Sequence, residues 1–409
     1  MQQDMQDTTG IKKNRIITVS LVTVCRGFQM LTFAGIALFL PLIRKDLGLS
    51  FTQGGTLSAA TTSVYALMQI PAGYLTDRFS PKRLFFIGVL GTCILCFTFG
   101  LVSEYWQALA NQILSGFFRA LIFMPGLLLL TGWFSSNRRA TAMGLSSIGA
   151  LWGTIVLNIA GPLLVTAFGW RFPFLSFAPA GIIASFVFLR FGKESPPIGE
   201  QRKVAMREML QLFRYRVMWV CGILQYIRLA VMQSIAFWLP SFLIHEKGLS
   251  LQLTGLIIAI QFGLIAPSNL LGGYVSDRLR NPTLVISFAL IILAITTALF
   301  VVVNNIIVLI ALICINGIFV QMYFGPLFAV PIDMLGMRTA GMLGGFSNFF
   351  ANIGAFSFIY LLGILKDTTG SFDSGFYAIA GICVIGLAFA ILLAQMRHKD
   401  TFRQNVQQQ

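Results

Sequence analysis

The chain has 409 residues, of which 56% are apolar and only 11% are charged, a composition that excludes an ordinary soluble globular protein. Apolar runs of membrane-spanning length follow one another along most of the chain and indicate a polytopic membrane protein. A formal charge of +15 would also suit a nucleic-acid partner, but the basic residues lie mainly between the apolar runs and therefore indicate membrane topology instead.

Twelve apolar runs predict an all-α membrane protein with twelve transmembrane helices in two six-helix, pseudo-symmetric halves. In the first half the helices are expected at residues 16–43, 52–76, 84–103, 107–134, 140–168 and 172–191. In the second half they are expected at 217–244, 251–276, 282–303, 305–334, 339–365 and 376–396. The expected parts are a cytoplasmic tail (1–15), an N-terminal half (16–191), a cytoplasmic linker (192–216), a C-terminal half (217–396) and a cytoplasmic tail (397–409).

The linker differs sharply in composition from both halves. It is rich in Lys, Arg, Glu and Pro, and the pair Pro196-Pro197 ends any helix that enters it. Residues 204–213 then have apolar residues at helical spacing with basic residues between them. This pattern predicts an interfacial helix on the cytoplasmic leaflet.

The distribution of the 29 Lys and Arg residues predicts the orientation of the chain. With a cytoplasmic N-terminus, twenty-one of them fall in inside segments and five in outside segments. Because positive charge is retained on the cytoplasmic side, both termini are expected inside, in a cell membrane and specifically a bacterial inner membrane. The first apolar run is too long for a signal peptide, so no cleavage is expected.

A repeated loop indicates that the chain is a duplication. Residues 73–78 have the sequence Gly-Tyr-Leu-Thr-Asp-Arg, and residues 273–278 have the sequence Gly-Tyr-Val-Ser-Asp-Arg. Upstream, Gly-Leu-Ser at 48–50 returns at 248–250. Internal symmetry between two multi-helix halves is typical of secondary transporters.

The repeated loop resembles the cytoplasmic motif of the major facilitator superfamily, and the resemblance covers about residues 16–396. The first copy of the motif is matched by Gly73, Leu75, Asp77, Arg78 and Lys82, and the weaker second copy by Gly273, Asp277 and Arg278. The resemblance implies that these residues gate the conformational change, with Asp77 capping the start of the eleventh helix in the outward-open state. A carboxylate at a helix start is favourable in any case, since it meets free N–H groups. The alternative is that the charged Asp-Arg pair only keeps a surface turn in contact with water and has no gating role.

Two features resemble particular branches of this superfamily. Ser80-Pro81 in the loop is similar to the organophosphate:phosphate antiporter branch, and residues 116–126 of the fourth expected helix resemble the anion:cation symporter branch. Members of the latter branch carry an Arg and a Glu where this chain has Gln112 and Arg119. That departure weakens the expectation of proton coupling.

Three basic residues remain inside expected helices, namely Arg26, Arg119 and Arg228. At about 1.5 Å per residue, each lies near the middle of the bilayer. None of the 14 acidic residues falls in the middle of an expected helix, so these arginines have no predicted protein counter-ion. We therefore expect an anionic substrate to bind them, because a guanidinium group pairs with carboxylate and phosphate through two parallel hydrogen bonds. The alternative is that they snorkel or pair with helix carbonyls.

Polar and aromatic residues at similar depth are candidates to complete the substrate site. They are Gln29, Tyr65, Trp152, Tyr226, Gln261, Tyr323, Asn348 and Asn352. Each has an alternative interpretation as a contact that holds membrane helices together. The sequence has no metal-ligand or nucleophile constellation, so neither a cofactor nor an enzymatic activity is expected.

The predicted function is secondary active transport of a small organic anion, either a carboxylate or a phosphorylated metabolite, by alternating access. Because no carboxylate is expected at mid-membrane, exchange or uniport is favoured over proton symport. The alternatives are a proton-coupled anion symporter and an exporter of hydrophobic or siderophore-like compounds. A sensor or membrane enzyme would need an added soluble domain or a reactive cluster. The expected partners are the anion, the lipid bilayer, and a proton or counter-anion; a monomer is expected.

Overall fold

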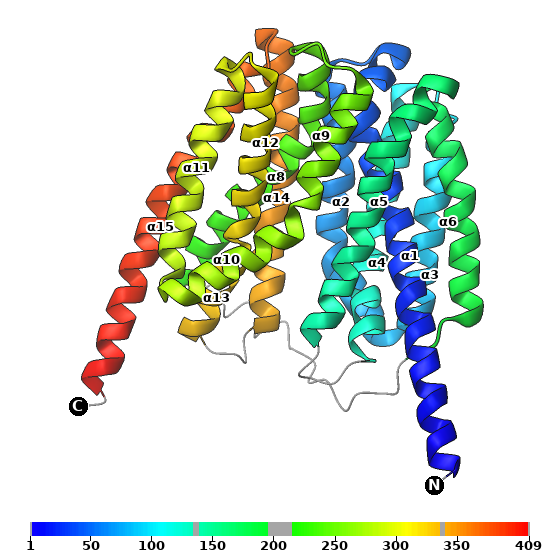
Figure 1. The fold of residues 1–409 in the computed structure, drawn as a ribbon, viewed down its shortest axis with the longest axis horizontal. Helices are drawn as coiled ribbons and strands as arrows, with labels where there is room; N and C mark the ends of the chain where they lie inside the picture. The colour runs from blue at the N-terminus through cyan, green and yellow to red at the C-terminus, as the bar shows by residue number, and fades with distance from the viewer. Residues whose placement is uncertain (1, 134–138, 195–214, 336–339, 408–409) are drawn as a thin grey trace. The chain divides into compact units, whose positions relative to one another are not determined.

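The computed structural model describes residues 2–133, 139–194, 215–335 and 340–407, and every regular element in these ranges is an α-helix (Figure 1). The first six are α1 (Gln2–Leu47), α2 (Phe51–Arg78), α3 (Pro81–Phe99), α4 (Tyr105–Thr131), α5 (Arg139–Phe168) and α6 (Arg171–Phe191). The others are α8 (Arg216–His245), α9 (Leu251–Gly263), α10 (Ile265–Leu279), α11 (Pro282–Val302), α12 (Ile306–Met322), α13 (Phe324–Leu335), α14 (Ala340–Thr369) and α15 (Asp373–Gln407). The interfacial helix predicted at 204–213 lies outside the described residues.

Two of the expected helices are interrupted. The expected helix at 251–276 is divided into α9 and α10 at Leu264, and the one at 305–334 into α12 and α13 at Tyr323. Each break lies three residues before a proline, Pro267 or Pro326, which has no N–H to donate to the carbonyl four residues earlier. With each interrupted pair counted as one helix, the described chain has twelve.

Eleven stretches of the described residues are long and apolar enough to cross a membrane. The helix left out is α2, which is 28 residues long but rich in Thr, Ser, Gly and Gln. Both terminal helices also continue past the predicted spans, since α1 begins at Gln2 and α15 ends at Gln407. A hydropathy pattern detects only the part of a helix that crosses the lipid, so it does not predict polar extensions of the helix beyond the membrane. The expectation of an all-α membrane protein is confirmed.

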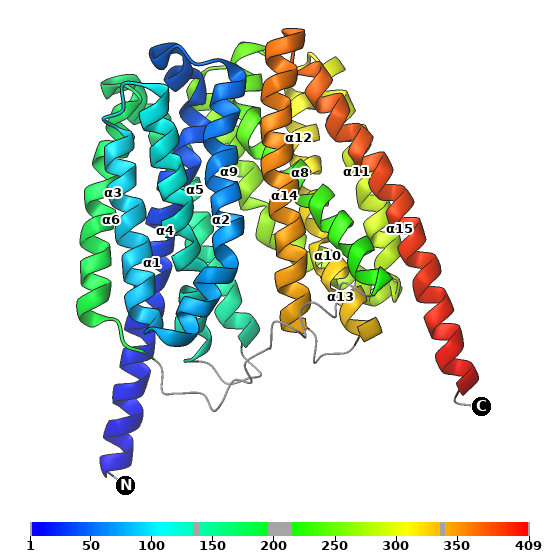
Figure 2. The ribbon, with the colours of Figure 1, turned by 180° about the vertical axis from the view of Figure 1, so that it is seen from behind.

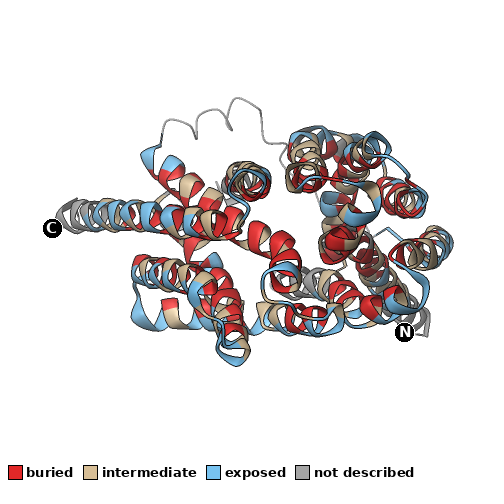
Figure 3. Cartoon of the chain, turned by 90° about the horizontal axis from the view of Figure 1, so that it is seen from above, coloured by how far each residue is buried: buried red, intermediate tan, exposed pale blue. Residues whose placement is uncertain are grey.

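The contacts divide the chain into two compact units. Unit 1 consists of residues 1–49, 60–201 and 250–259, and unit 2 consists of residues 50–59, 202–249 and 260–409. The division does not follow the sequence halves, because the starts of α2 and α9 each belong to the unit formed mainly by the other half. Most helices of both units carry buried residues along one side and exposed residues along the other (Figure 3).

The core of unit 1 lies between α1, α3, α4 and α6, with α3 packed against both α4 and α6 (Figure 2). In this core the rings of Phe85 and Phe188 pack edge to face, with their centroids 5.0 Å apart. The helix pair α1/α5 crosses very closely, since a Cβ placed on Gly153 would lie 2.0 Å from the carbonyl oxygen of Gly27. Small residues permit this approach in a membrane protein.

Unit 2 repeats this plan around α8, which is buried along most of its length and packs against α14 and α15. A Cβ on Gly354 of α14 would lie 2.1 Å from the carbonyl oxygen of Tyr226 on α8. Residues 153 and 354 are 201 apart, and residues 27 and 226 are 199 apart. The pair α8/α14 therefore corresponds to α1/α5, as a duplication requires.

Candidate functional site

The three intramembrane arginines fall in two clusters, one in each unit. Arg26 on α1 and Arg119 on α4 belong to unit 1, and Arg228 on α8 belongs to unit 2. Arg26 and Arg228 are each only 7% exposed. Burial at this level is costly for a charged side chain unless a partner offsets the lost hydration.

In unit 1, α1, α2 and α4 bring four side chains together. The guanidinium of Arg26 lies 5.6 Å from the ring centroid of Phe123, and that of Arg119 lies 5.2 Å from the ring centroid of Tyr65. The charge of Arg26 acts on Arg119, and the Tyr65 hydroxyl interacts electrostatically with both. Aromatic faces stabilise a guanidinium group only in part, by about 0.5–2 kcal/mol each.

The hydrogen-bonding groups of Arg26 are incompletely used. Its Nε and Nη1 atoms are buried and have no hydrogen-bond partner in the part of the chain that the structure describes. Nor does any described carboxylate lie within ion-pair distance of Arg26. A ligand with two acceptor oxygens would match these free donors, because the guanidinium fork forms two parallel hydrogen bonds.

In unit 2, the break between α12 and α13 brings two aromatic residues to Arg228. The guanidinium lies 4.4 Å from the ring centroid of Phe324 and interacts electrostatically with Tyr323, the residue at the break. Its Nε donates to Oε1 of Gln225, one turn earlier on α8, at 3.0 Å. The hydroxyl of Tyr323 and Nε2 of Gln225 are buried and have no partner among the described residues.

A small cavity of about 30 Å³ also lies in unit 2. Its polar lining is contributed by α8, α9 and α12 and consists of Gln233, Gln261, Asn316 and Gln321. Met232, also in the lining, lies one turn beyond Arg228 on α8 and accepts a hydrogen bond from Nε2 of Gln321 at 3.0 Å. A cavity of this size holds about one water molecule. Only Gln261 in this group was predicted from the sequence.

Several predicted site residues instead connect helices. Trp152 Nε1 donates to the carbonyl of Thr23 at 3.2 Å, joining α5 to α1. The hydroxyl of Tyr226 lies 2.9 Å from Oγ of Ser357, joining α8 to α14. These contacts favour the packing interpretation for Trp152 and Tyr226.

Three other candidates lie on the same helices as these contacts. Gln29 is buried on α1, one turn from Arg26. Asn352 is buried and donates to the carbonyl of Asn348 on its own helix at 2.8 Å, while Asn348 itself is half-buried. The Asn352 contact also favours the packing interpretation.

Gln112, which stands where the anion:cation symporter branch has an arginine, belongs to a polar network in unit 1. Its Oε1 accepts from the hydroxyl of Thr61 at 2.8 Å, and its Nε2 donates to Oδ1 of Asn111 at 3.1 Å. Asn111 in turn donates to the carbonyl of Leu95 and to the hydroxyl of Thr98, both at 2.9 Å. The network holds α2, α3 and α4 together.

The two copies of the loop motif share one contact. Arg78 lies over the ring of Tyr74 at 4.7 Å, and Arg278 Nη1 lies 3.2 Å from the hydroxyl of Tyr274. Each arginine therefore contacts the tyrosine one turn before it. Gly73, Gly273 and Asp277 lie on the same two helix ends.

The expected contact of Asp77 with the eleventh helix lies outside the described residues, since neither the Asp77 side chain nor the side chains at the start of α14 are described. Lys82 lies in the first turn of α3, where its N–H donates to Oε1 of Glu194 at 3.2 Å. Glu194 also accepts from the hydroxyl of Ser80, the N-cap of that helix. The sequence did not indicate this contact.

Two ring contacts in the clusters were also not predicted. Phe123 lies one helical turn after Arg119 on α4, and Phe324 directly follows the predicted Tyr323. In the sequence, each of these phenylalanines is recognisable only by its proximity to an arginine or to Tyr323. With 38 phenylalanines in the chain, such proximity is common and does not predict a contact. Their role depends on the ring orientation, which spacing does not give.

Comparison with known proteins identifies the fold. The family model of the Major Facilitator Superfamily matches residues 22–359 and 243–408. A bacterial homolog of the human lysosomal transporter Spinster, solved in an inward-facing and unoccupied conformation, superposes with a TM-score of 0.82 at 17% identity, covering 95% of this chain and 98% of that one. At this identity the likeness shows the fold alone.

Similar curated proteins cover nearly the whole chain. The hexuronate transporter of Bacillus subtilis (strain 168) is 24% identical over 91% of this chain and 93% of its own length. The probable sulfoacetate transporter SauU of Cupriavidus necator is 23% identical over 95% and 96%. The D-galactonate transporter of Escherichia coli O6:H1 is 22% identical over 93% and 96%. The substrates in all three names are organic acids.

Proposed function

Since the chain belongs to the Major Facilitator Superfamily, whose members are multi-pass membrane transporters and not enzymes, we propose that it carries a small organic acid across the membrane by alternating access. The bound form is the carboxylate anion. Both termini lie in the cytoplasm, the membrane is a bacterial inner membrane, and the transporter acts as a monomer.

One observation carries the proposal, namely the unpaired burial of Arg26. Its Nε and Nη1 atoms are removed from water without a hydrogen-bond acceptor among the described residues. An intramembrane arginine costs at least about 2.5–3.5 kcal/mol. A carboxylate that enters the site offsets this cost and is bound in a defined orientation, which explains why the charge is retained.

A carboxylate is favoured over a phosphorylated metabolite. The relatives are named for hexuronate, sulfoacetate, D-galactonate and galactarate or D-glucarate, all of which carry a carboxylate. Within unit 2, neutral donors and acceptors of Gln225 and Tyr323 lie in the same cluster as Arg228. Such groups orient a substrate, whereas the guanidinium supplies most of the attraction.

Exchange or uniport is favoured over proton symport. Arg119 occupies the helix position where the anion:cation symporter branch has a glutamate. It lies near Arg26 and has the same positive charge. A second guanidinium attracts an anion but stays protonated at physiological pH, so it does not take up and release a proton during transport. Coupled movement of a proton then requires that the substrate itself carries it.

The test is counterflow in liposomes containing the purified protein. A thermal-shift screen first compares D-glucuronate, D-galactonate, D-glucarate and sulfoacetate with glycerol 3-phosphate and with neutral glucose. For the best carboxylate, Arg26→Lys and Arg228→Lys should each lower counterflow at least tenfold, because lysine retains the charge but not the fork. Arg190→Lys is the matched control, since Arg190 also lies over a phenylalanine ring, at 5.6 Å from Phe191, but at a helix end.

Two results would overturn the proposal. Transport that is unchanged in both arginine variants would remove the anion site. Transport of a hydrophobic compound that tolerates loss of both arginines would favour an exporter instead.

A further inference from the structure

The starts of α2 and α9 are exchanged between the two units. Residues 50–59 pack in unit 2, whereas residues 60–78 of the same helix pack in unit 1. Conversely, residues 250–259 pack in unit 1, whereas the chain from residue 260 packs in unit 2. The two exchanged segments, 50–59 and 250–259, begin at the serines of the two copies of Gly-Leu-Ser and are equivalent in the duplication.

The backbones of the two exchanged segments pack in equivalent ways. A Cβ on Gly55 would lie 3.1 Å from the carbonyl oxygen of Ile359 on α14, and a Cβ on Gly255 would lie 2.1 Å from the carbonyl oxygen of Asn158 on α5. Positions 359 and 158 are 201 residues apart, as expected for equivalent sites. Each exchanged segment therefore lies in close contact with the corresponding helix of the duplication, α14 or α5.

The side chains that hold the two segments differ in charge. In unit 2, the N–H of Phe51 donates to Oδ1 of Asp367 at 2.9 Å, and the N–H of Thr52 donates to Oδ2 at 2.6 Å. In unit 1, the residue equivalent to Asp367 is Thr166, whose hydroxyl accepts from Nε2 of Gln252 at 2.8 Å. A carboxylate at a helix start meets two free donors and the positive end of the helix dipole, whereas a hydroxyl offers only a neutral hydrogen bond.

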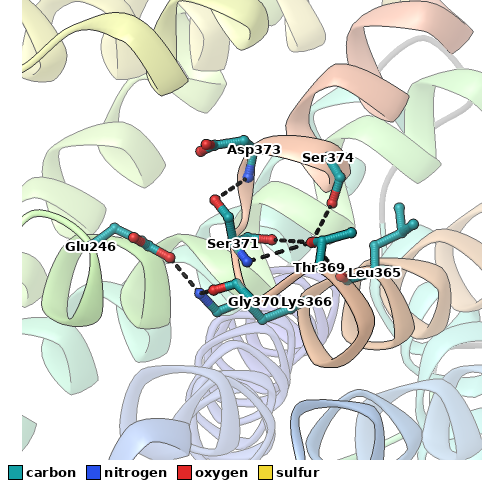
Figure 4. Close-up of polar contacts among 8 residues, drawn as sticks. All are labelled: Glu246, Leu365, Lys366, Thr369, Gly370, Ser371, Asp373 and Ser374. Atoms are coloured by element: carbon teal, nitrogen blue, oxygen red, sulfur yellow. Dashed lines mark hydrogen bonds and ion pairs between the residues drawn. The ribbon is translucent and has the colours of Figure 1, made fainter.

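The residue before Asp367 is also charged, and it ties this end of α14 to the end of α8. Lys366 is only 8% exposed, and its Nζ donates to Glu246 and to the carbonyl of Gly370 at 2.7 Å (Figure 4). The same Nζ lies 4.6 Å from the ring centroid of Phe372 and 5.4 Å from that of Phe51. In unit 1 the equivalent position is the apolar Val165. Among the described residues, charged groups therefore hold the exchanged segment of unit 2, whereas a neutral hydrogen bond holds that of unit 1.

We propose that Asp367, on the helix end that the Lys366–Glu246 ion pair ties to α8, is a latch that retains the start of α2 in unit 2. This role rests on the proposed alternating access, in which the exchanged segments must leave their contacts when the transporter changes state. Release of the α2 segment breaks two hydrogen bonds to a carboxylate, whereas release of the α9 segment breaks one neutral side-chain bond. The two segments are then held with unequal strength, and Asp367 determines the population of the state in which α2 is released.

Hydrogen exchange on the full-length protein in lipid nanodiscs tests the latch without any substrate. In Asp367→Asn, the amides of residues 51–56 should exchange at least about tenfold faster than in the wild type, since hydrogen bonds to a charged group are the stronger kind. Residues 251–256 should be unchanged. The matched control, Thr166→Val, should accelerate residues 251–256 by less than about threefold and leave residues 51–56 unchanged.

Asp367→Glu, which retains the charge, should restore most of the protection. If Asp367→Asn does not yield folded protein, Asp367→Ser supplies the same comparison with a smaller side chain. Exchange of residues 51–56 within twofold of the wild type in the folded variant would overturn the latch. Failure of wild-type counterflow with D-galactonate and the other acids would instead count against the proposed function, and the exchange result would stand independently.

Discussion

Unit 1 places two guanidinium groups, Arg26 and Arg119, over aromatic rings, whereas the described unit 2 cluster has one, Arg228, beside the neutral groups of Gln225 and Tyr323. The helix frames around the two clusters are nevertheless alike, since α1/α5 and α8/α14 cross at equivalent close contacts. The duplication therefore fixes the backbone arrangement and leaves the charge free to differ. In the proposed transporter, the unit 1 cluster offers an anion two guanidinium groups, and the described unit 2 cluster offers one guanidinium with neutral hydrogen-bonding groups.

The largest effect is expected from Arg228→Gln. This change removes the guanidinium of the described unit 2 cluster and should weaken binding of the best organic acid by about 100-fold, or about 3 kcal/mol, because a buried charged partner is lost. The measurement is isothermal titration of the purified protein. Arg228→Lys should retain part of the affinity; a loss below about threefold for Arg228→Gln would contradict the role of this cluster.

A smaller effect is expected from Arg26→Gln, because Arg119 remains nearby. Affinity should fall about tenfold, and the ligand-free protein should become more stable by about 1 kcal/mol, since a buried charge with no ion-pair partner among the described residues is removed. Titration and thermal unfolding without ligand measure the two changes. A loss of affinity as large as that of Arg228→Gln would show that Arg26 and Arg119 do not share the anion. A less stable ligand-free protein would show that burial of the Arg26 charge is already compensated.

The smallest effects are expected from the two tyrosines. Tyr323→Phe should weaken binding about fivefold, since the hydroxyl is buried without a partner among the described residues and is available to the anion. Tyr65→Phe should change affinity less than twofold, because its ring face contacts Arg119. Parallel titrations compare the two variants. Equal losses would contradict the different roles given to the two tyrosine hydroxyls.

The helix plan and the three arginines were accessible from the sequence because lipid imposes a strong local signal. A membrane-spanning helix must be apolar over its length, so Arg26, Arg119 and Arg228 are conspicuous in it. The breaks at Leu264 and Tyr323 had a signal in Pro267 and Pro326, but membrane helices often tolerate proline, as α4 does at Pro125. Sequence alone does not separate the two outcomes.

The exchanged segments and the latch were not predictable by the same reasoning. The contact between Asp367 and the start of α2 joins residues more than 300 positions apart, and no local pattern encodes it. The amides around the unit 2 cavity, such as Gln233 and Gln321, were overlooked for a different reason. An amide in an apolar helix serves helix packing and ligand binding equally well, and only its neighbours distinguish the two uses.

Both helix interruptions in the described chain fall in unit 2, and one of them places Phe324 against the guanidinium of Arg228, with Tyr323 close enough to act on it electrostatically. In unit 1, α2 and α4 run without interruption past Pro71 and Pro125. An interrupted helix lacks some of the backbone hydrogen bonds that resist bending. Tolerance of acids that differ in length or stereochemistry is therefore expected to arise in unit 2, so selection for new substrates should yield changes around residues 264 and 323 before it alters the arginine pair of unit 1.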